Sequence, residues 1–396
     1  MQGDVSVAVV GGGGHVGLPL SIVLANSGVR TFAFDISEES INSINSGRMP
    51  FVEEEGNHFL REALSKGNLV ATSDPKCISY VSHIVVVIGT PVNEHLSPDP
   101  RSVLNSILDL VDFMAEHQIL LLRSTVFPGV TAKVAEELRK RFPRMHVAYC
   151  PERIIEGQAL QEIPVLPQLI GADSSEAFEA AKIIFDKIGV ESVCVSTVEA
   201  ELAKLFTNVW RYIKFAAANQ FWMMSNDLSV DYEKVRRAIS YNYPRASDLP
   251  SAGFTAGPCL FKDTMQLAAL VQHGFPLGHS AMMINEGMPG YLVQRLKLKY
   301  DLSNMTVGIL GMSFKGNVDD IRSSLAYKLR KLLLFETKEV LITDPFTQDS
   351  RNVSLEEVLR RSDLLILGSP HDLYKNLVTN KRVIDIWGHL RNGVVV

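Results

Sequence analysis

One cysteine of this chain stands in a glycine-rich loop with a lysine and an aspartate close behind it. The loop reads GFTAGPCLFKD over residues 253–263. Gly257 permits a left-handed backbone or a close approach, and proline fixes φ just before the thiol, so such a loop can hold Cys259 exposed in a set direction. Most free cysteines are small buried hydrophobes. The Lys262–Asp263 pair and the rest of the chain favour a nucleophilic thiol instead.

A second chemical pattern lies near the N-terminus. An apolar run over residues 5–10 leads into a turn in which Gly12, Gly14 and Gly17 fit GxGxxG, and after a helix-competent segment a second apolar run ends at Asp35. Strand, glycine turn, helix, strand and acid follow one another in the order of a dinucleotide site. Because Asp35 would accept hydrogen bonds from ribose hydroxyls, the pattern favours NAD over NADP. A flavin site and a structural glycine turn are the alternatives.

Three further apolar runs end in polar groups or turns. The runs and the residues after them are 84–88 with GTP at 89–91, 117–122 with RSTVFPG at 123–129, and 147–150 with PER at 151–153. Ligands of open parallel sheets bind at the carboxyl ends of strands, so we expect these ends to face one crevice. Taken singly, a plain strand exit explains Thr90 and a helix N-cap explains Thr125 equally well.

Helical periodicity replaces the strand pattern from about residue 198. Lys204 and Asn208 are four residues apart and share one face of the expected helix. The segment 261–298 also has a helical pattern, with a break at residues 274–278. A long helix from about residue 280 into the 290s, interrupted near residues 287–290, would join the helical middle to the last hundred residues.

Those last hundred residues return to alternating strands and helices, without a GxGxxG turn. Lys315 and Arg322 come after the first of these strands. An arginine can bind a phosphate in a bidentate manner, so the pair could hold one, although ordinary surface charge explains both residues as well.

Composition narrows the class of protein. With 396 residues, 46% hydrophobic and 21% charged, the chain is expected to form two or three globular domains. A net charge of −5 gives no reason to expect nucleic acid or an anionic membrane as partner. The four cysteines lack CxxC spacing, which argues against a metal site and a disulfide framework and fits a reducing compartment. No signal peptide or long apolar run is recognised, so a cytoplasmic protein without a membrane span is predicted.

Together these segments resemble the nucleotide-sugar 6-dehydrogenases, the family of UDP-glucose, UDP-N-acetylglucosamine and UDP-N-acetylmannosamine dehydrogenases. The resemblance covers nearly the whole chain and keeps the family's order. The segments that carry it are VVGGGGHVGLP at 9–19, GTP at 89–91, STV at 124–126, PER with EG at 151–157, ELAK with Asn208 at 201–208, GPCLFKD at 257–263 and GMSFKGNVDDIRSS at 311–324. One such segment is weak evidence, whereas the ordered set is specific.

The resemblance implies an α/β fold of two Rossmann-like parallel-sheet domains joined by a helical middle with a long connecting helix. Residues 1–195 would bind NAD. Residues 196–300 would carry the cysteine loop and form a homodimer, and residues 301–396 would bind the UDP-sugar.

The resemblance also implies a four-electron oxidation of the sugar C6 alcohol to a carboxylate with two NAD, through an aldehyde and a thioester, for polysaccharide biosynthesis. The matching catalytic residues are Cys259, Lys204, Asn208, Asp263, Glu152 and Thr125. Cys259 would attack the aldehyde, which keeps it from escaping. Lys204 and Asn208 would stabilise the oxyanion. Asp263 would position or activate water, and Glu152 would act as a general base through a water.

Binding residues are implied by the same matches. Those for the cofactor are Gly12, Gly14, His15, Val16, Asp35, Thr90 and Thr125. Those for the substrate are Glu152, Arg153, Lys204, Asn208, Arg245, Gly257, Phe314, Lys315 and Arg322. Arg245 would reach across the dimer into the partner's substrate site.

The sugar and the activity have alternatives. Arg153 stands where the glucose enzymes usually carry Phe and resembles the N-acetylhexosamine branch, so a UDP-N-acetylhexosamine is favoured over UDP-glucose. A one-step β-hydroxyacid dehydrogenase would leave the last α/β unit and Cys259 unexplained. A silent nucleotide-binding regulatory protein would have no need of the intact set Cys259, Lys204, Asn208 and Asp263.

Overall fold

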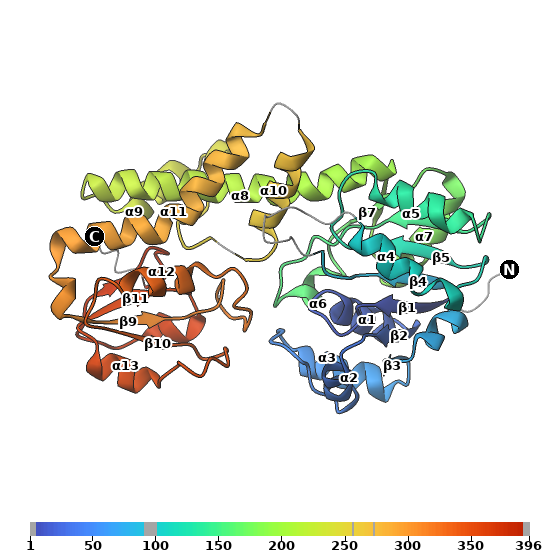
Figure 1. Cartoon of the computed structure of the whole chain (residues 1–396), viewed down its shortest axis with the longest axis horizontal. Helices are drawn as coiled ribbons and strands as arrows, with labels where there is room; N and C mark the ends of the chain where they lie inside the picture. The colour runs from blue at the N-terminus through green and yellow to red at the C-terminus, as the bar shows by residue number, and fades with distance from the viewer. Residues whose placement is uncertain (1–4, 91–100, 256, 272–273, 391–396) are drawn as a thin grey trace. The chain divides into compact units, whose positions relative to one another are not determined.

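A computed structural model describes residues 5–90, 101–255, 257–271 and 274–390 (Figure 1). The predictions that touch Pro91 and Ala256, in the GTP segment and the cysteine loop, lie outside these residues. The chain divides into two compact units, Met1–Phe206 and Thr207–Val396. None of the described helices is long and apolar enough to cross a membrane.

The first unit is built on a sheet of eight strands in the order β3-β2-β1-β4-β5-β6-β7-β8. The strands are β1 Ser6–Val10, β2 Arg30–Phe34, β3 Leu69–Thr72, β4 His83–Val86, β5 Ile119–Leu122, β6 His146–Tyr149, β7 Gln168–Gly171 and β8 Ser192–Val195. Neighbouring strands are parallel except β6 and β7. The chain reverses direction across the sheet between β1 and β4, and ligands of such sheets bind at that point.

Helices cover both faces of this sheet. The helices of the unit are α1 Gly17–Asn26, α2 Glu38–Asn45, α3 Gly56–Ser65, α4 Ser102–Leu108, α5 Val130–Arg139, α6 Ala159–Glu162 and α7 Ser175–Lys187. Ala8 and Val10 of β1 pack in one core with α4 and α5, whereas Val7 and Val9 pack in another with α1 and α7. Because both faces are buried, the strands have continuous apolar sequences instead of alternating ones.

Long helices come next in the chain. They are α8 Thr197–Asp227, α9 Tyr232–Ser240, α10 Leu260–Leu270 and α11 Pro276–Lys299. The expected interruption near residues 287–290 is wrong, because α11 runs through Pro289 without a break. Proline removes one helical hydrogen bond, but Met288, Pro289 and Leu292 are buried, and their packing holds the helix together.

The second unit contains a smaller sheet, in the order β10-β9-β11-β12 with all pairs parallel. Its strands are β9 Thr306–Leu310, β10 Glu339–Thr343, β11 Leu364–Leu367 and β12 Val383–Ile384, and its helices are α12 Leu325–Leu333 and α13 Leu355–Arg361. One face of the sheet packs in a core with α11 and α12, and the other face packs with α13. Two α/β units with largely parallel sheets and long helices between the sheets in sequence confirm the predicted fold class.

Candidate active site

The glycine turn after β1 packs closely against the protein's own backbone, which leaves no room for a Cβ at Gly12 or Gly17. Gly11 has a left-handed φ of +83°, and a Cβ on Gly12 would lie 2.6 Å from the Ala33 backbone. A Cβ on Gly17 would lie 2.2 Å from the Gly11 carbonyl oxygen. Helix α1 begins there with no side-chain cap and no acid in its first turn, so its N–H groups can bind an anion. Val16 is the N-cap residue of this helix.

Asp35 is held beside the same turn. Its Oδ2 accepts the Gly13 N–H at 2.9 Å and its Oδ1 accepts the Ser37 N–H at 3.0 Å. A carboxylate has about four acceptor sites, so the half-buried side chain retains sites for ribose hydroxyls. His15 stacks on Phe51 with ring centroids 4.2 Å apart. These features fit NAD. The glycine turn and the helix N-terminus would bind its pyrophosphate, and Asp35 would bind a ribose.

The polar ends of β4 and β5 belong to the same unit. Thr90 and Thr125 come after these strands and are both half-buried. Thr125 is not a helix N-cap, because α5 begins at Val130. Glu201 does that work instead: its buried carboxylate accepts the N–H groups of Gly129 at 2.7 Å and Thr131 at 2.9 Å.

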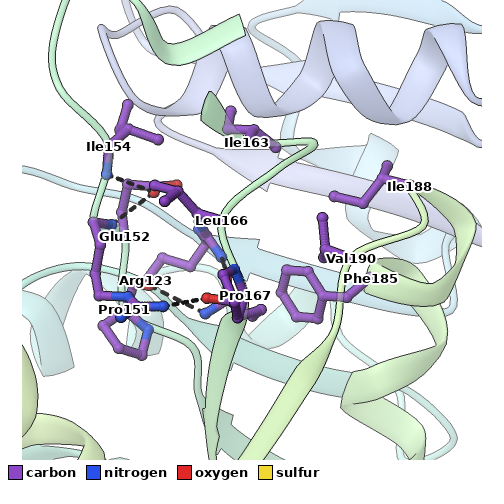
Figure 2. A pocket seen from close by; sticks show the side chains of 12 residues that line it. Arg123, Pro151, Glu152, Ile154, Ile163, Leu166, Pro167, Phe185, Ile188 and Val190 are labelled. Atoms are coloured by element: carbon purple, nitrogen blue, oxygen red, sulfur yellow. Dashed lines mark hydrogen bonds and ion pairs between the residues drawn. The ribbon is translucent and has the colours of Figure 1, made fainter. Parts of the chain in front are cut away.

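Glu152 lies at the carboxyl end of β6 with both carboxylate oxygens occupied. Oε2 accepts from the buried Arg123 guanidinium, and Oε1 accepts the Arg153 and Ile154 N–H groups at 2.7 Å and 3.1 Å. Arg123 also donates to Gln168 Oε1 at 2.8 Å. These residues line a small hollow on the first unit (Figure 2).

The charges around Glu152 keep it ionised. Burial alone would raise the pKa of Glu152, but the charge and hydrogen bond of Arg123, the Arg153 N–H and the charge of Lys204 together lower that pKa below its ordinary value. Lys204 is therefore close enough to Glu152 to affect it electrostatically. Both predicted residues belong to the first unit.

Asn208 and Asp263 meet in the second unit. The Asn208 amide donates to Asp263 Oδ2 at 2.5 Å, and Lys262 Nζ lies 3.6 Å from Asp263 Oδ1. The Asp263 side chain is fully buried. Asn208 lies one turn along α8 from Lys204, as the spacing predicted.

Cys259 is exposed and is the N-cap residue of α10. Backbone N–H groups and the dipole at a helix N-terminus stabilise the negative charge of a thiolate. Gly257 has φ of +107°, and a Cβ there would lie 2.7 Å from the Phe314 ring, so this loop packs directly against Phe314. By contrast, burial raises the pKa of both Cys77 and Cys150 to about 12.

Three other predicted substrate residues, Lys315, Arg322 and Arg245, belong to the second unit. Lys315 is half-buried and Arg322 is exposed, and both come after β9. Arg322 Nη2 contacts Asp320 Oδ2 at 2.5 Å. Arg245 is exposed with its guanidinium over the Tyr243 ring, 5.7 Å from its centroid, and is not brought to the Asn208–Asp263 pair by any contact among the described residues.

Sequence reasoning did not assign roles to Arg123, Gln168 or Glu201. Arg123 and Glu201 stood inside recognised segments, but their partners are 29 to 45 and 70 to 72 residues away in the chain. The sequence offered one indication of these roles: Arg123 is a charged residue directly after an apolar strand.

Comparison with known proteins identifies the class. Residues 5–189 match the NAD binding domain of the UDP-glucose/GDP-mannose dehydrogenase family, residues 198–287 its central domain and residues 308–392 its UDP binding domain. The UDP-N-acetyl-D-mannosamine dehydrogenase of Pyrococcus horikoshii is 29% identical over 384 residues, which are 94% of this chain and 90% of that protein.

Solved structures agree. The UDP-D-ManNAc dehydrogenase from Pyrococcus horikoshii superposes with a TM-score of 0.86 at 28% identity, over 94% of this chain and 91% of that chain. A UDP-glucose dehydrogenase from Pyrobaculum islandicum has a TM-score of 0.89 at 24% identity, over 99% and 97% of the two chains, and shows the likeness of fold.

The chain belongs to the UDP-glucose/GDP-mannose dehydrogenase family. It is an NAD-dependent UDP-sugar dehydrogenase, and the predicted family, enzyme class and cofactor are confirmed.

Proposed function

We propose that this enzyme oxidises the C6 alcohol of a UDP-N-acetylhexosamine to a carboxylate in two successive oxidations, with Cys259 as the nucleophile. The observation that carries the proposal is an exposed thiol at the N-terminus of α10, four residues before an aspartate that is buried and bonded to Asn208. A structural cysteine has no need of that placement. NAD accepts a hydride at each of the two oxidations.

The thiol makes the second oxidation possible. The first oxidation turns the C6 alcohol into an aldehyde, and Cys259 Sγ adds to its carbonyl carbon to give a thiohemiacetal, which has a C–H bond able to donate a hydride. Loss of that hydride gives a thioester. Water then attacks the thioester carbon, and the products are the carboxylate and the free thiol.

Lys204 and Asn208 stabilise the oxyanions formed on this route. An amide nitrogen carries two N–H donors, and the bond to Asp263 occupies one of those on Asn208. That bond fixes the orientation of the amide and leaves the second donor for a developing oxyanion.

Asp263 is the better of the two carboxylates for activating water. Its Oδ1 has no hydrogen-bond partner among the described residues, although Lys262 Nζ lies 3.6 Å away. Glu152 has both oxygens engaged and a lowered pKa, which makes it a weak base. We therefore propose that the negative charge of Glu152 positions Lys204 and a water molecule in the site.

Two features favour an N-acetylhexosamine. The Pyrococcus horikoshii relative is a UDP-N-acetyl-D-mannosamine dehydrogenase, and Arg153 matches the acetamido-sugar branch of the family. UDP-glucose is the second candidate. Lys315, Arg322 and Phe314 would contact the UDP-sugar from a nucleotide-binding segment over residues 301–396, and Gly257 would contact it from the cysteine loop. An NAD-binding segment over residues 1–195 would hold the cofactor.

A homodimer formed through the helical segment 196–300 accords with an apolar stripe on α8. Trp210, Phe221 and Met224 of α8, with Leu228 directly after its last residue, recur at helical spacing. Their exposed fractions are 57%, 45%, 56% and 76%. Burying such a stripe against a second copy would remove it from water. Arg245, exposed on the same unit, would then reach the partner's substrate. The dimer would work in the cytoplasm, where thiols stay reduced.

The first test is the number of NADH formed per sugar consumed, with UDP-glucose, UDP-N-acetylglucosamine, UDP-N-acetylmannosamine and UDP-N-acetylgalactosamine. Two NADH per sugar with one acetamido sugar, lost in Cys259→Ala, is the expected result. One NADH per sugar, unchanged in Cys259→Ala, would show a one-step dehydrogenase in which the thiol is structural. No NADH with any of these four sugars would point to an untested sugar as the substrate, or to a silent binding protein.

A further inference from the structure

A buried histidine lies under the carboxyl ends of three strands of the second sheet. His371 comes after β11, has no exposed surface, and lies between residues that come after β9 and β10. Its Nε2 is 3.0 Å from Asp344 Oδ2 and 3.2 Å from Ser313 Oγ. Its Nδ1 accepts the backbone N–H of Asn317 at 2.9 Å.

These contacts determine the protonation of the ring. Because Nδ1 accepts a hydrogen bond from a backbone N–H, it carries no proton, and the proton of the neutral ring is on Nε2. Asp344 can only accept: it also takes the N–H groups of Met312 at 2.6 Å and Phe346 at 2.8 Å. Burial would raise the pKa of Asp344, but the hydrogen bond from His371 and those from the backbone N–H groups of Met312 and Phe346 hold that pKa at about 2. An ionised Asp344 and a neutral His371 with Nε2–H satisfy every contact.

Nδ1 of His371 accepts a hydrogen bond from a loop that contains a residue in the left-handed backbone conformation. Asn317 has a left-handed φ of +60°, and its Oδ1 accepts the Asp372 N–H at 2.9 Å, so two hydrogen bonds join it to the segment 371–372. A Cβ on Gly316 would lie 2.3 Å from the Pro370 carbonyl oxygen, so the loop lies directly on that segment. A left-handed conformation at a residue other than glycine persists only when its surroundings hold it.

We propose that His371 is a positioning residue for nucleotide binding, because its unprotonated Nδ1 holds the loop 314–322 that presents Lys315 and Arg322. The inference rests on the proposed function, in which these two cations contact the UDP-sugar. Loss of the acceptor would free the Asn317 turn and weaken nucleotide affinity. The groups that carry out the oxidation lie outside this loop, so we expect a larger change in UDP affinity and KM than in kcat at saturating substrate.

Two substitutions separate the two sides of the ring. In His371→Asn the amide Oδ1 takes the place of Nδ1 and can accept the Asn317 N–H, but the side chain does not reach Asp344. In His371→Gln the amide Nε2 reaches Asp344 and the acceptor for Asn317 is lost. We expect UDP to bind His371→Asn within about threefold of wild type and His371→Gln about tenfold more weakly, since losing one buried hydrogen-bond partner has roughly that effect. UDP affinity by calorimetry is the measurement, with kcat and KM for the sugar beside it.

Nitrogen chemical shifts of His371 give a readout that does not depend on activity. Wild type is expected to show an unprotonated Nδ1 and a protonated Nε2, and slow hydrogen exchange at the Asn317 amide that becomes fast in His371→Gln. A proton on Nδ1, equal UDP affinity of His371→Gln and wild type, or equal weakening in both variants would overturn the inference. If wild type itself does not bind UDP, the proposed function fails and the inference fails with it.

Discussion

Removal of the Arg123 guanidinium would leave a buried negative charge without its main partner. Arg123 is 3% exposed and pairs with Glu152, whose remaining partners are two backbone N–H groups and the charge of Lys204. Breaking a buried pair from one side costs about 3–5 kcal/mol. At about 2–4 °C per kcal/mol for a unit of this size, we expect Arg123→Met to lower the Tm by roughly 10 °C at pH 7.5.

The pH dependence identifies the cause. In wild type the folded-state pKa of Glu152 is depressed, so its stabilising contribution is present above the ordinary Glu pKa of about 4.3 and is lost as pH falls toward the folded pKa. In Arg123→Met burial dominates and the folded pKa of Glu152 lies above its unfolded value. Protonation then relieves the cost, so the variant becomes more stable as the pH falls from 8 to 5.5, where wild type changes little at this site.

The assay is thermal unfolding at pH 5.5 and 8 for wild type, Arg123→Met, Glu152→Gln and the double variant. The double variant removes the unpaired charge and should recover most of the lost Tm. Arg144→Met is the matched control: Arg144 pairs with Glu116 at 3.0 Å, but its side chain is 85% exposed, so its loss should shift the Tm by little. Two results would refute this account: a Tm of Arg123→Met within 1 °C of the wild-type Tm, or a double variant whose Tm is no higher than that of Arg123→Met.

Four other outcomes are expected. In a Cys194→Ser background, iodoacetamide at pH 8 should label Cys259 in the folded protein and leave the buried Cys77 and Cys150 unlabelled. Peptide mapping is the measurement, and labelling of all three thiols at one rate would contradict the prediction. Asp263→Asn should slow turnover about 10²–10⁴-fold and accumulate thioester, seen by intact mass after acid quench, and normal turnover would remove Asp263 from the chemistry. Gly257→Ala should cut kcat/KM at least tenfold, because φ of +107° and the Phe314 ring oppose a Cβ, and unchanged kinetics would show that the loop adapts. Met224→Asp should give a monomer by light scattering, whereas an intact dimer would place the interface elsewhere.

Much of the fold could be predicted from the sequence because its buried strands are short apolar runs and its glycine turn is locally encoded. The run over residues 5–10 and the turn at Gly12 required no knowledge of the rest of the chain. The continuity of α11 could not be predicted, since local preference opposes Pro289 and only burial of that face retains it. The antiparallel pairing of β6 and β7 likewise depends on chain path and not on local pattern.

The site was predictable where chemistry is carried by residues close together in the chain. Cys259 and Asp263, or Lys204 and Asn208, are four residues apart, and helical geometry relates the members of each pair. Buried side chains whose partners are far away in the chain were not predictable. Glu201 caps a helix that begins 71 residues earlier in the sequence, and nothing in the spacing encodes that contact.

The two sheets have the same local arrangement at the end of their first strand. Gly11 and Gly311 both come directly after a first strand with left-handed φ, of +83° and +88°, and both donate to the last residue of the neighbouring strand, at 3.0 Å and 2.8 Å. An acid comes after that neighbouring strand in each, Asp35 in one and Asp344 in the other. Asp35 retains acceptor sites for a ribose. Both oxygens of Asp344 instead accept hydrogen bonds, from four backbone N–H groups and from His371. The acid of the second sheet is thus engaged within the protein, whereas the acid of the first sheet can still accept hydrogen bonds from a ribose.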